Sequence, residues 1–279
     1  MVIDVSIENP RHLAEILETP GIQRVMLAGD RYDAAGWNRV CEEIHRAGKQ
    51  AIYAFPYVLR REALQYYQKN REYMAEAGWD GFLIRSLDAA GLVQEEAWEG
   101  IRIFDQGMYT WNRRAVQQMR ALGADLMTLP YELRQSEMDL RGYEDSQLVV
   151  YGRLPVMISA QCSRKTTGHC RLLQGKKREQ ASCEAEFIAL RDRKSAAFRE
   201  DSHCRFCYSV IYNSVPLWLV DRIPEACSQV RFAFTDEPVG VPSRILKESL
   251  RLNSEGIWEI YGHPSADDFT RGHFMRGVE

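Results

Sequence analysis

Five of the seven cysteines in this chain lie close together, between residues 162 and 207. They are Cys162, Cys170, Cys183, Cys204 and Cys207. Thiolates are strong ligands for zinc and for iron-sulfur clusters, and a reducing compartment keeps such thiols from forming structural disulfides. The segment is therefore a candidate metal or cluster site.

The intervals between these cysteines are irregular. Seven, twelve, twenty and two residues separate them in turn, so only one Cys-x2-Cys pair occurs. A zinc ribbon needs two such pairs. Widely spaced thiols suit an iron-sulfur cluster, whose iron corners accept ligands from distant turns, and they also suit an irregular zinc site completed by His169 or His203. Plain buried cysteines are the third alternative.

The charge of the chain is uneven. Residues 162–199 carry ten lysines or arginines against four acidic residues, which is +6 and leaves −9 on the remainder of a chain of net charge −3. The molecule as a whole therefore lacks the net positive charge that is typical of nucleic-acid-binding proteins, although the basic run 171–178 can approach RNA phosphates. The start of the chain lacks the apolar stretch of a signal peptide, and no apolar run reaches membrane-spanning length, so we expect a soluble, cytoplasmic protein.

Short β-branched or aromatic runs recur along the chain with amphipathic segments between them. The expected strands are 2–7, 24–28, 51–55, 81–84, 101–104, 126–129, 148–151 and 229–235. The expected helices include 33–47, 114–122 and 241–252, of which the first carries Cys41 on its apolar side. Packing in the core is the role expected for Cys41 and Cys227.

Eight strands that alternate with helices predict a (β/α)8 barrel over residues 1–279. A length of 279 residues and 45% hydrophobic content fit one large barrel. An open doubly wound sheet would carry a glycine-rich turn after its first strand, and this chain has none there. Residues 153–228 are then a long cysteine-rich insertion between strands seven and eight, at the C-terminal face where barrel enzymes keep their active sites.

Polar residues follow most of the predicted strands and are expected at the same mouth. They are Asp30, Arg85, Ser86, Asp105, Gln106, Glu132, Arg153, Asp236 and Glu237. Arg153 suits a carboxylate or phosphate, because its guanidinium forms bidentate pairs. Glu132 is a candidate general acid or base. Arg271 and His273 follow the eighth unit and are expected to fold back over the mouth, with His273 as a third catalytic candidate.

Four phrases of the sequence are specific enough to indicate a family. They are Tyr-Gly-Arg-Leu-Pro-Val-Met at 151–157, Leu-Arg-Asp-Arg at 190–193, Cys-Tyr-Ser-Val-Ile-Tyr-Asn-Ser at 207–214 and Phe-Thr-Arg-Gly-His-Phe at 269–274. Together with Asn112 and Leu-Pro-Tyr-Glu-Leu at 129–133, they resemble the collagenase-like peptidase family U32. The resemblance runs from about Phe104 to the C-terminus.

This resemblance implies a (β/α)8 barrel and, in several members, a [4Fe-4S] cluster on four cysteines. Cys162, Cys170 and Cys183 match the first three ligands, Cys207 matches the fourth, and Cys204 competes for that place; zinc is the alternative metal. Such members support oxygen-independent hydroxylation of RNA or of a small aromatic substrate, often with prephenate as the suggested oxygen source. Others were named as proteases.

The resemblance also has a gap. The first hundred residues lack the opening phrases of many members, and the chain is similar to the second barrel of the longer ones. Three functions follow: an iron-sulfur protein of the hydroxylating branch, a peptidase, or a non-catalytic subunit that docks to a second barrel. Trp218 and Leu219 are candidates for that contact, with packing in the core as the alternative that we favour. The sequence contains neither the His-Glu-x-x-His motif of metalloproteases nor the Gly-x-Ser-x-Gly motif of serine hydrolases, so no known motif supports the peptidase.

Overall fold

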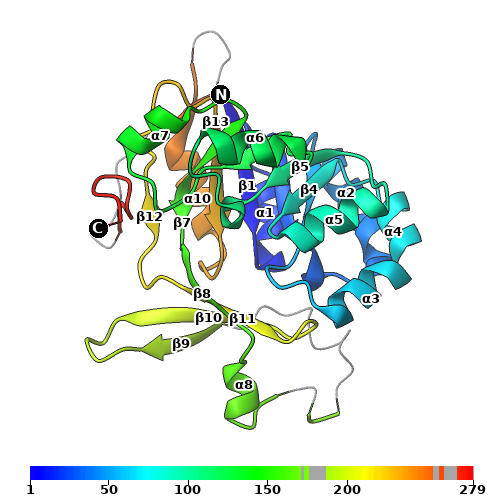
Figure 1. Ribbon diagram of the computed structural model, residues 1–279. Coiled ribbons are helices and arrows are strands. Elements are labelled where there is room, and N and C mark those ends of the chain that lie inside the picture. Colours follow the sequence, from blue (N-terminus) through cyan, green and yellow to red (C-terminus); the bar gives the residue numbers. More distant parts are fainter. Residues whose placement is uncertain (171–172, 176–186, 254–257, 261–268, 279) are drawn as a thin grey trace.

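Eight parallel strands close into a barrel in the computed structural model, which describes residues 1–170, 173–175, 187–253, 258–260 and 269–278. The strands are β1 (Val2–Ile7), β2 (Arg24–Ala28), β3 (Gln50–Ala54), β4 (Gly81–Ile84), β5 (Ile101–Phe104), β6 (Leu126–Thr128), β7 (Ser146–Gly152) and β13 (Gln229–Phe234). β13 pairs with both β7 and β1, which closes the ring (Figure 1). The predicted (β/α)8 barrel is confirmed, and its strand boundaries agree within two residues.

Helices join the barrel strands on the outside. They are α1 (Leu13–Leu17), α2 (Trp37–Arg46), α3 (Arg61–Lys69), α4 (Arg71–Glu76), α5 (Leu87–Glu95), α6 (Arg113–Ala121), α7 (Gln135–Arg141) and α10 (Val241–Ser249), with 3-10 turns η1 (Pro10–His12), η2 (Gly29–Arg31), η3 (Ala34–Gly36) and η4 (Gln106–Met108). Ser86 and Asn112 cap α5 and α6, because each side chain accepts a hydrogen bond from a backbone N–H of the first turn.

The predicted helix 241–252 is wrong at its end. The helix α10 stops at Ser249, and the next three residues form β14 (Leu250–Leu252), which pairs with β15 (Trp258–Ile260). In this arrangement the backbone N–H and C=O groups of β14 form hydrogen bonds with β15, in place of the bonds that they would form within a longer helix.

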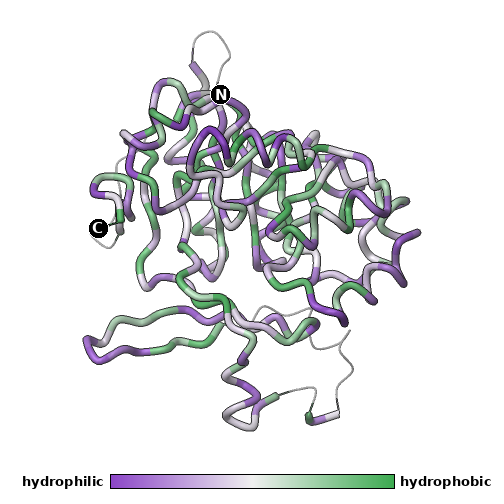
Figure 2. The backbone as a smooth tube through the Cα atoms, in the orientation of Figure 1, coloured by the Kyte–Doolittle hydropathy of each residue, from purple (hydrophilic) through white to green (hydrophobic). Residues whose placement is uncertain are grey.

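The barrel has a core on each side of its wall, because successive side chains of a strand point to opposite faces. One group of buried residues consists of Met26, Ile52, Ala54, Leu83, Ile103 and Leu126. Their chain neighbours, such as Val25, Leu27 and Tyr53, belong to the larger core that includes the helices. Figure 2 shows the apolar colour concentrated on the barrel strands and the polar colour along the outer faces of the helices.

The insertion forms a small sheet at one end of the barrel. Its elements are β8 (Pro155–Ser159), α8 (Ser163–Thr166), β9 (Phe187–Arg191), β10 (Ala197–His203), β11 (Tyr208–Tyr212) and β12 (Leu217–Trp218). The first, third, fourth and fifth of these elements form an antiparallel sheet in the order β8-β11-β10-β9, while β12 pairs with β7 (Figure 1). The sequence predicted an insertion here but not its strands.

The chain leaves the barrel at a tight point. Gly152 ends β7 with φ +146°, and a Cβ atom there would lie 2.4 Å from the carbonyl oxygen of Ala233 on β13. Only glycine allows the two strands to pair this closely. Beyond it, Arg153 turns the chain toward β8.

No helix in the described part of the chain is long and apolar enough to cross a membrane.

Candidate metal centre and barrel mouth

Four of the clustered cysteines line one cavity of about 690 Å³ in the insertion. They are Cys162, Cys170, Cys204 and Cys207, and the buried His203 lines the same cavity. Cys183 lies outside the described residues. Among the described cysteines none forms a disulfide, so these thiols are free to act as ligands.

Strand pairing explains why cysteines far apart in sequence converge. Cys204 and Cys207 lie in the tight turn between β10 and β11. Because β8 pairs with β11 and Ser159 lies opposite Ser209, the end of β8 lies beside that turn. Cys162 follows β8 directly, at the start of α8, and its Sγ lies 3.8 Å from Ser202 Oγ on β10.

The thiol of Cys204 lies close to two others. Burial raises the pKa of this thiol, and the neighbouring Cys162 and Cys170 raise it further, since several thiolates in one place repel each other. A bound cation removes that repulsion, because metal ligands bind as thiolates. The cavity also carries positive charge from Arg60, Arg164 and Lys165, which favours a negatively charged cluster.

The remaining sulfur and imidazole candidates lie elsewhere. Cys41 and Cys227 are each 1% exposed and belong to the hydrophobic core, as expected. His169 is exposed, and its Nδ1 lies 3.2 Å from Thr167 Oγ1. Of the two histidines proposed as added zinc ligands, His203 alone lines the cavity in the described part of the chain.

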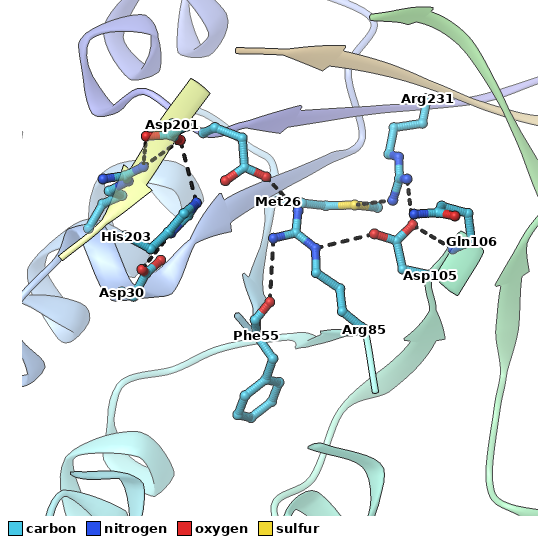
Figure 3. A network of polar contacts seen from close by, with 11 residues as sticks. Met26, Asp30, Phe55, Arg85, Asp105, Gln106, Asp201, His203 and Arg231 are labelled. Atoms are coloured by element: carbon cyan, nitrogen blue, oxygen red, sulfur yellow. Dashed lines mark hydrogen bonds and ion pairs between the residues drawn. The ribbon is translucent and has the colours of Figure 1, made fainter. Parts of the chain in front are cut away.

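A chain of ion pairs crosses the carboxyl ends of the barrel strands (Figure 3). Arg85, after β4, lies 2.6 Å from Glu8 and 3.3 Å from Asp105. Arg231 of β13 lies 2.6 Å from the other oxygen of Asp105. Burial works to raise the pKa of Asp105, but Arg231 and Arg85 outweigh it and lower the pKa to about 2. The carboxylate therefore stays ionised between its two arginines.

A second group of ion pairs joins the barrel to the insertion. Asp30, after β2, accepts a hydrogen bond of 2.7 Å from Nδ1 of His203, which ends β10. The neighbouring Arg31 lies 2.5 Å from Asp201 of the same strand. The pKa of Asp30 lies well below its ordinary value, because His203, Arg31 and Arg205 together outweigh the effect of burial. All of these side chains are buried.

A second cavity, of about 460 Å³, opens over the barrel mouth. Both Glu132 and His273 line it, next to Arg85 and the aromatic rings of Tyr57 and Tyr131. The guanidinium carbon of Arg85 lies 4.1 Å from the centre of the Tyr57 ring. Two of the three catalytic candidates thus share one cavity although 141 positions separate them in the chain.

The third candidate, Arg153, does not line either of these two cavities. Its Nε lies 2.9 Å from Asp236, and its Nη1 donates to the carbonyl oxygens of Asn213 and Ser214. The side chain ties the start of the insertion to its end. Arg271 likewise pairs with Asp221, so neither arginine has a free guanidinium.

Glu237 follows β13 and is 8% exposed. Burial raises the pKa of Glu237 to about 6, even though a backbone N–H of Thr235 donates to its carboxylate. Tyr151 donates to its other oxygen at 3.2 Å. The pair lies between β7 and β13, at the base of the insertion.

Sequence reasoning missed several members of the mouth. Glu8 and Arg31 lie just beyond the ends of barrel strands, and a wider window around each strand end would have found them, whereas Arg231 lies within β13 and reaches Asp105 from there. Asp201 had no such signal. Its position in the site depends on β10 crossing the mouth.

Trp218 and Leu219 are 5% and 3% exposed and belong to the hydrophobic core, which was the favoured alternative to a partner contact.

Comparison with protein-family models finds no match, and no curated protein matches the sequence. Among solved structures, the U32 peptidase Mk0906 aligns over 85% of this chain and 94% of its own, with a TM-score of 0.51 and 10% identity. The fold resembles that of a U32 peptidase. The aligned share exceeds the part of the chain outside residues 153–228, so the likeness to the U32 peptidase includes part of the insertion.

Other barrels align less well. The type I 3-dehydroquinate dehydratase from Clostridium difficile covers 55% of this chain and 75% of its own, with a TM-score of 0.38 and 12% identity. The 3-dehydroquinate dehydratase from Aquifex aeolicus VF5 covers 53% and 79%, with a TM-score of 0.35 and 16% identity. At such identities a likeness is one of fold alone.

Proposed function

We propose that this chain is an iron-sulfur protein that supports oxygen-independent hydroxylation of a small aromatic substrate at the barrel mouth. The observation that carries the proposal is the convergence of Cys162, Cys170, Cys204 and Cys207 on one cavity. Four thiols are the usual ligand set of a [4Fe-4S] cluster. The motif resemblance to family U32 supports the same cofactor, with Cys162, Cys170 and Cys183 as three ligands and either Cys207 or Cys204 as the fourth.

The size of the cavity suits a cluster better than a lone zinc ion. A zinc ion and a [4Fe-4S] cluster each take four ligands, so the number of cysteines does not choose between them. A cavity of about 690 Å³, however, exceeds the space that one ion needs. A bound cluster supplies one-electron transfer. Cys204 directly follows His203, which contacts Asp30 at the barrel mouth. The thiol cavity and the mouth are therefore adjacent.

The mouth cavity favours a small aromatic molecule as substrate. Tyr57 and Tyr131 offer ring faces, Arg85 offers a cation, and Val156, Met157 and Ile158 of β8 offer apolar surface. Aromatic rings pack well against such side chains. Hydroxylation replaces C–H by C–OH and removes two electrons and two protons from the substrate and a water-level oxygen donor, which is water or an organic hydroxyl compound. An external one-electron redox protein would take the electrons one at a time, a transfer that a bound cluster would support.

The first test is analytical. Protein purified without oxygen should be brown and contain about four iron and four sulfide per chain, as expected for one [4Fe-4S] cluster. If the analysis found one zinc ion per chain and no sulfide, the cysteines would bind zinc and not a cluster. Protein with neither metal, even after reconstitution with iron and sulfide, would refute the cofactor.

The second test concerns the substrate. Cells that lack this gene should lose one hydroxylated aromatic metabolite, detected by mass spectrometry as the product minus one oxygen atom. A loss confined to RNA nucleosides would instead identify an RNA substrate. The same cells complemented with a Cys162→Ser variant should remain deficient, because hydroxylation needs the cluster.

Peptidase activity has weaker support. Glu132 and His273 share a cavity, but its described lining contains no serine, threonine or cysteine to act as a nucleophile. Hydrolysis of gelatin by purified, metal-free protein would favour the peptidase over the hydroxylase.

Docking to a second barrel subunit has one observation in its favour. Val156, Met157 and Ile158 of β8 are 53%, 56% and 44% exposed, which is unusual for consecutive apolar residues. A partner that co-purifies through this strand, together with inactivity of the chain alone, would support a non-catalytic role.

A further inference from the structure

Three buried side chains at the junction of barrel and insertion direct ligand atoms toward one another. Glu8 follows β1, while Asp201 and His203 lie on β10, and one ligand atom of each lies within 4.8 Å of the others. We propose that these residues bind a divalent transition-metal ion, at a second site separate from the thiols. Two carboxylates and an imidazole suit Mn²⁺, Fe²⁺ or Zn²⁺.

Three atoms of this trio have no hydrogen-bond partner among the described residues. They are Oε2 of Glu8, Nε2 of His203 and Oδ1 of Asp201, on side chains that are almost fully buried, and the last of them lies in the ion pair with Arg31. A buried polar atom without a partner costs about 1–3 kcal/mol. The nearest polar contact of the imidazole nitrogen is Oδ2 of Asp201, at 3.5 Å. Oδ2 of Asp201 already accepts a hydrogen bond of 2.5 Å from Arg31, so a cation between the two atoms supplies the missing partner of Nε2 and adds a second contact to the carboxylate.

The orientation of His203 is that of a metal ligand. Its Nδ1 donates to the ionised Asp30 at 2.7 Å, so in the neutral imidazole the lone pair lies on Nε2. Its ring stacks on Tyr208, with centroids 4.3 Å apart and planes at 7°. A carboxylate that holds one nitrogen while the other binds the ion is the usual support of a metal-bound histidine.

The charges of the network leave room for a cation. Arg85 contacts Oε1 of Glu8 but not Oε2, and Arg31 contacts Asp201. The connected buried network holds four carboxylates (Glu8, Asp30, Asp105 and Asp201) and three guanidiniums (Arg31, Arg85 and Arg231), apart from Arg205, which pairs with Asp33. When the imidazole is neutral, as a metal ligand must be, one negative charge is left for the bound ion to offset; when it is protonated, the network is already balanced.

The geometry needs a modest adjustment. Metal–ligand distances of about 2.0–2.2 Å place two tetrahedral ligand atoms about 3.4 Å apart. The trio spans up to 4.8 Å, so side-chain shifts of about 1 Å close the site. The two neighbouring arginines weaken the affinity, since they repel a cation.

Manganese separates this site from the thiol site. Mn²⁺ prefers carboxylate and imidazole ligands to thiolates, and its free form is counted directly by electron paramagnetic resonance. Titration of the purified protein should show one bound Mn²⁺ per chain. Glu8→Gln keeps an acceptor for Arg85 and should weaken binding at least about tenfold, as His203→Gln should. The control His45→Gln alters an exposed imidazole that pairs with Asp80 and should bind like the wild type.

The outcomes are decisive in either direction. Circular dichroism confirms that each variant is folded, and for a variant that does not fold, the anomalous signal of Mn²⁺ in crystals of the wild-type protein replaces the titration. The proposal is overturned by unchanged binding in Glu8→Gln, by Mn²⁺ located away from Nε2 of His203, or by no binding to the wild type. Cys162→Ser should lose iron and sulfide and keep Mn²⁺. The iron and sulfide content thus tests the proposed cluster, and Mn²⁺ binding tests the second site separately.

Discussion

Asp30 and His203 share a buried hydrogen bond of 2.7 Å although 173 positions separate them in the chain. Asp30 lies in the turn η2 directly after the barrel strand β2, and His203 ends the strand β10 of the insertion. Their contact, with the adjacent pair of Arg31 and Asp201, fastens the insertion over the barrel mouth. The same contact places His203 between the thiol cavity and the ion pairs of the mouth.

Loss of the Asp30 charge should destabilise the protein. In Asp30→Asn the buried Arg31 and Arg205 lose a compensating charge, and removal of one partner from a buried ionic group costs about 3–5 kcal/mol. Asp33→Asn is the matched control, because Asp33 also pairs with Arg205 but is half exposed, and its loss should cost under about 1 kcal/mol. Urea unfolding measures both. Equal effects would show that the Asp30 contact does not fasten the insertion.

Cys204 and Cys207 compete for the fourth cluster position, and we expect Cys204 to fill it. Cys204 is half-buried and close enough to Cys162 and Cys170 for them to raise its pKa, whereas Cys207 is exposed. Cys204→Ser should therefore lower the iron and sulfide content at least about tenfold, and Cys207→Ser should retain most of it. Cys227→Ala, in the core, serves as control. The reverse order of the two serine variants would assign the position to Cys207.

Glu237 should make stability depend on pH. Burial raises its pKa from 4.5 to about 6 in the folded protein. The neutral carboxyl is thus favoured by folding, and its contribution is fully present below pH 4.5 and lost as the pH rises through about 6. The difference is about 2 kcal/mol.

Glu237→Gln keeps an uncharged side chain of the same shape at every pH. Relative to the wild type it should be about 2 kcal/mol more stable at pH 8 than at pH 4. Denaturant unfolding across this range measures the difference, with the exposed Glu99→Gln as control. A difference that does not change with pH would mean that Glu237 is ionised as readily in the folded chain as in the unfolded one.

Two glycines should respond to alanine in opposite directions. Gly152→Ala places a Cβ atom 2.4 Å from the carbonyl oxygen of Ala233, and we expect a loss of about 2–3 kcal/mol or more. Gly91 lies in α5 with no atom within 4 Å of the added Cβ, so Gly91→Ala should gain about 1 kcal/mol from helix propensity. Thermal unfolding of both variants tests the closeness of β7 and β13 at the exit to the insertion.

The barrel was predictable because its signals are local. Each strand and helix carries its own hydrophobic period, and capping residues such as Ser86 and Asn112 lie within the same turn as the groups that they bind. Right-handed alternation of strand and helix then allows few arrangements. The likeness to the U32 peptidase Mk0906 agrees with that result.

The site depended on contacts that no local pattern encodes. Sequence reasoning brought the cysteines together as candidates, and it named Asp30 and Asp105, because thiol density and strand ends are visible in one dimension. It did not pair Asp30 with His203, nor Glu8 with Arg85, and it gave Arg153 a ligand-binding role although Asp236 holds its guanidinium. Ion pairs across the mouth arise only when the β8-β11-β10-β9 sheet is laid over the closed barrel. Burial then makes each unpaired charge costly, and that cost, absent in an extended chain, selects the partners.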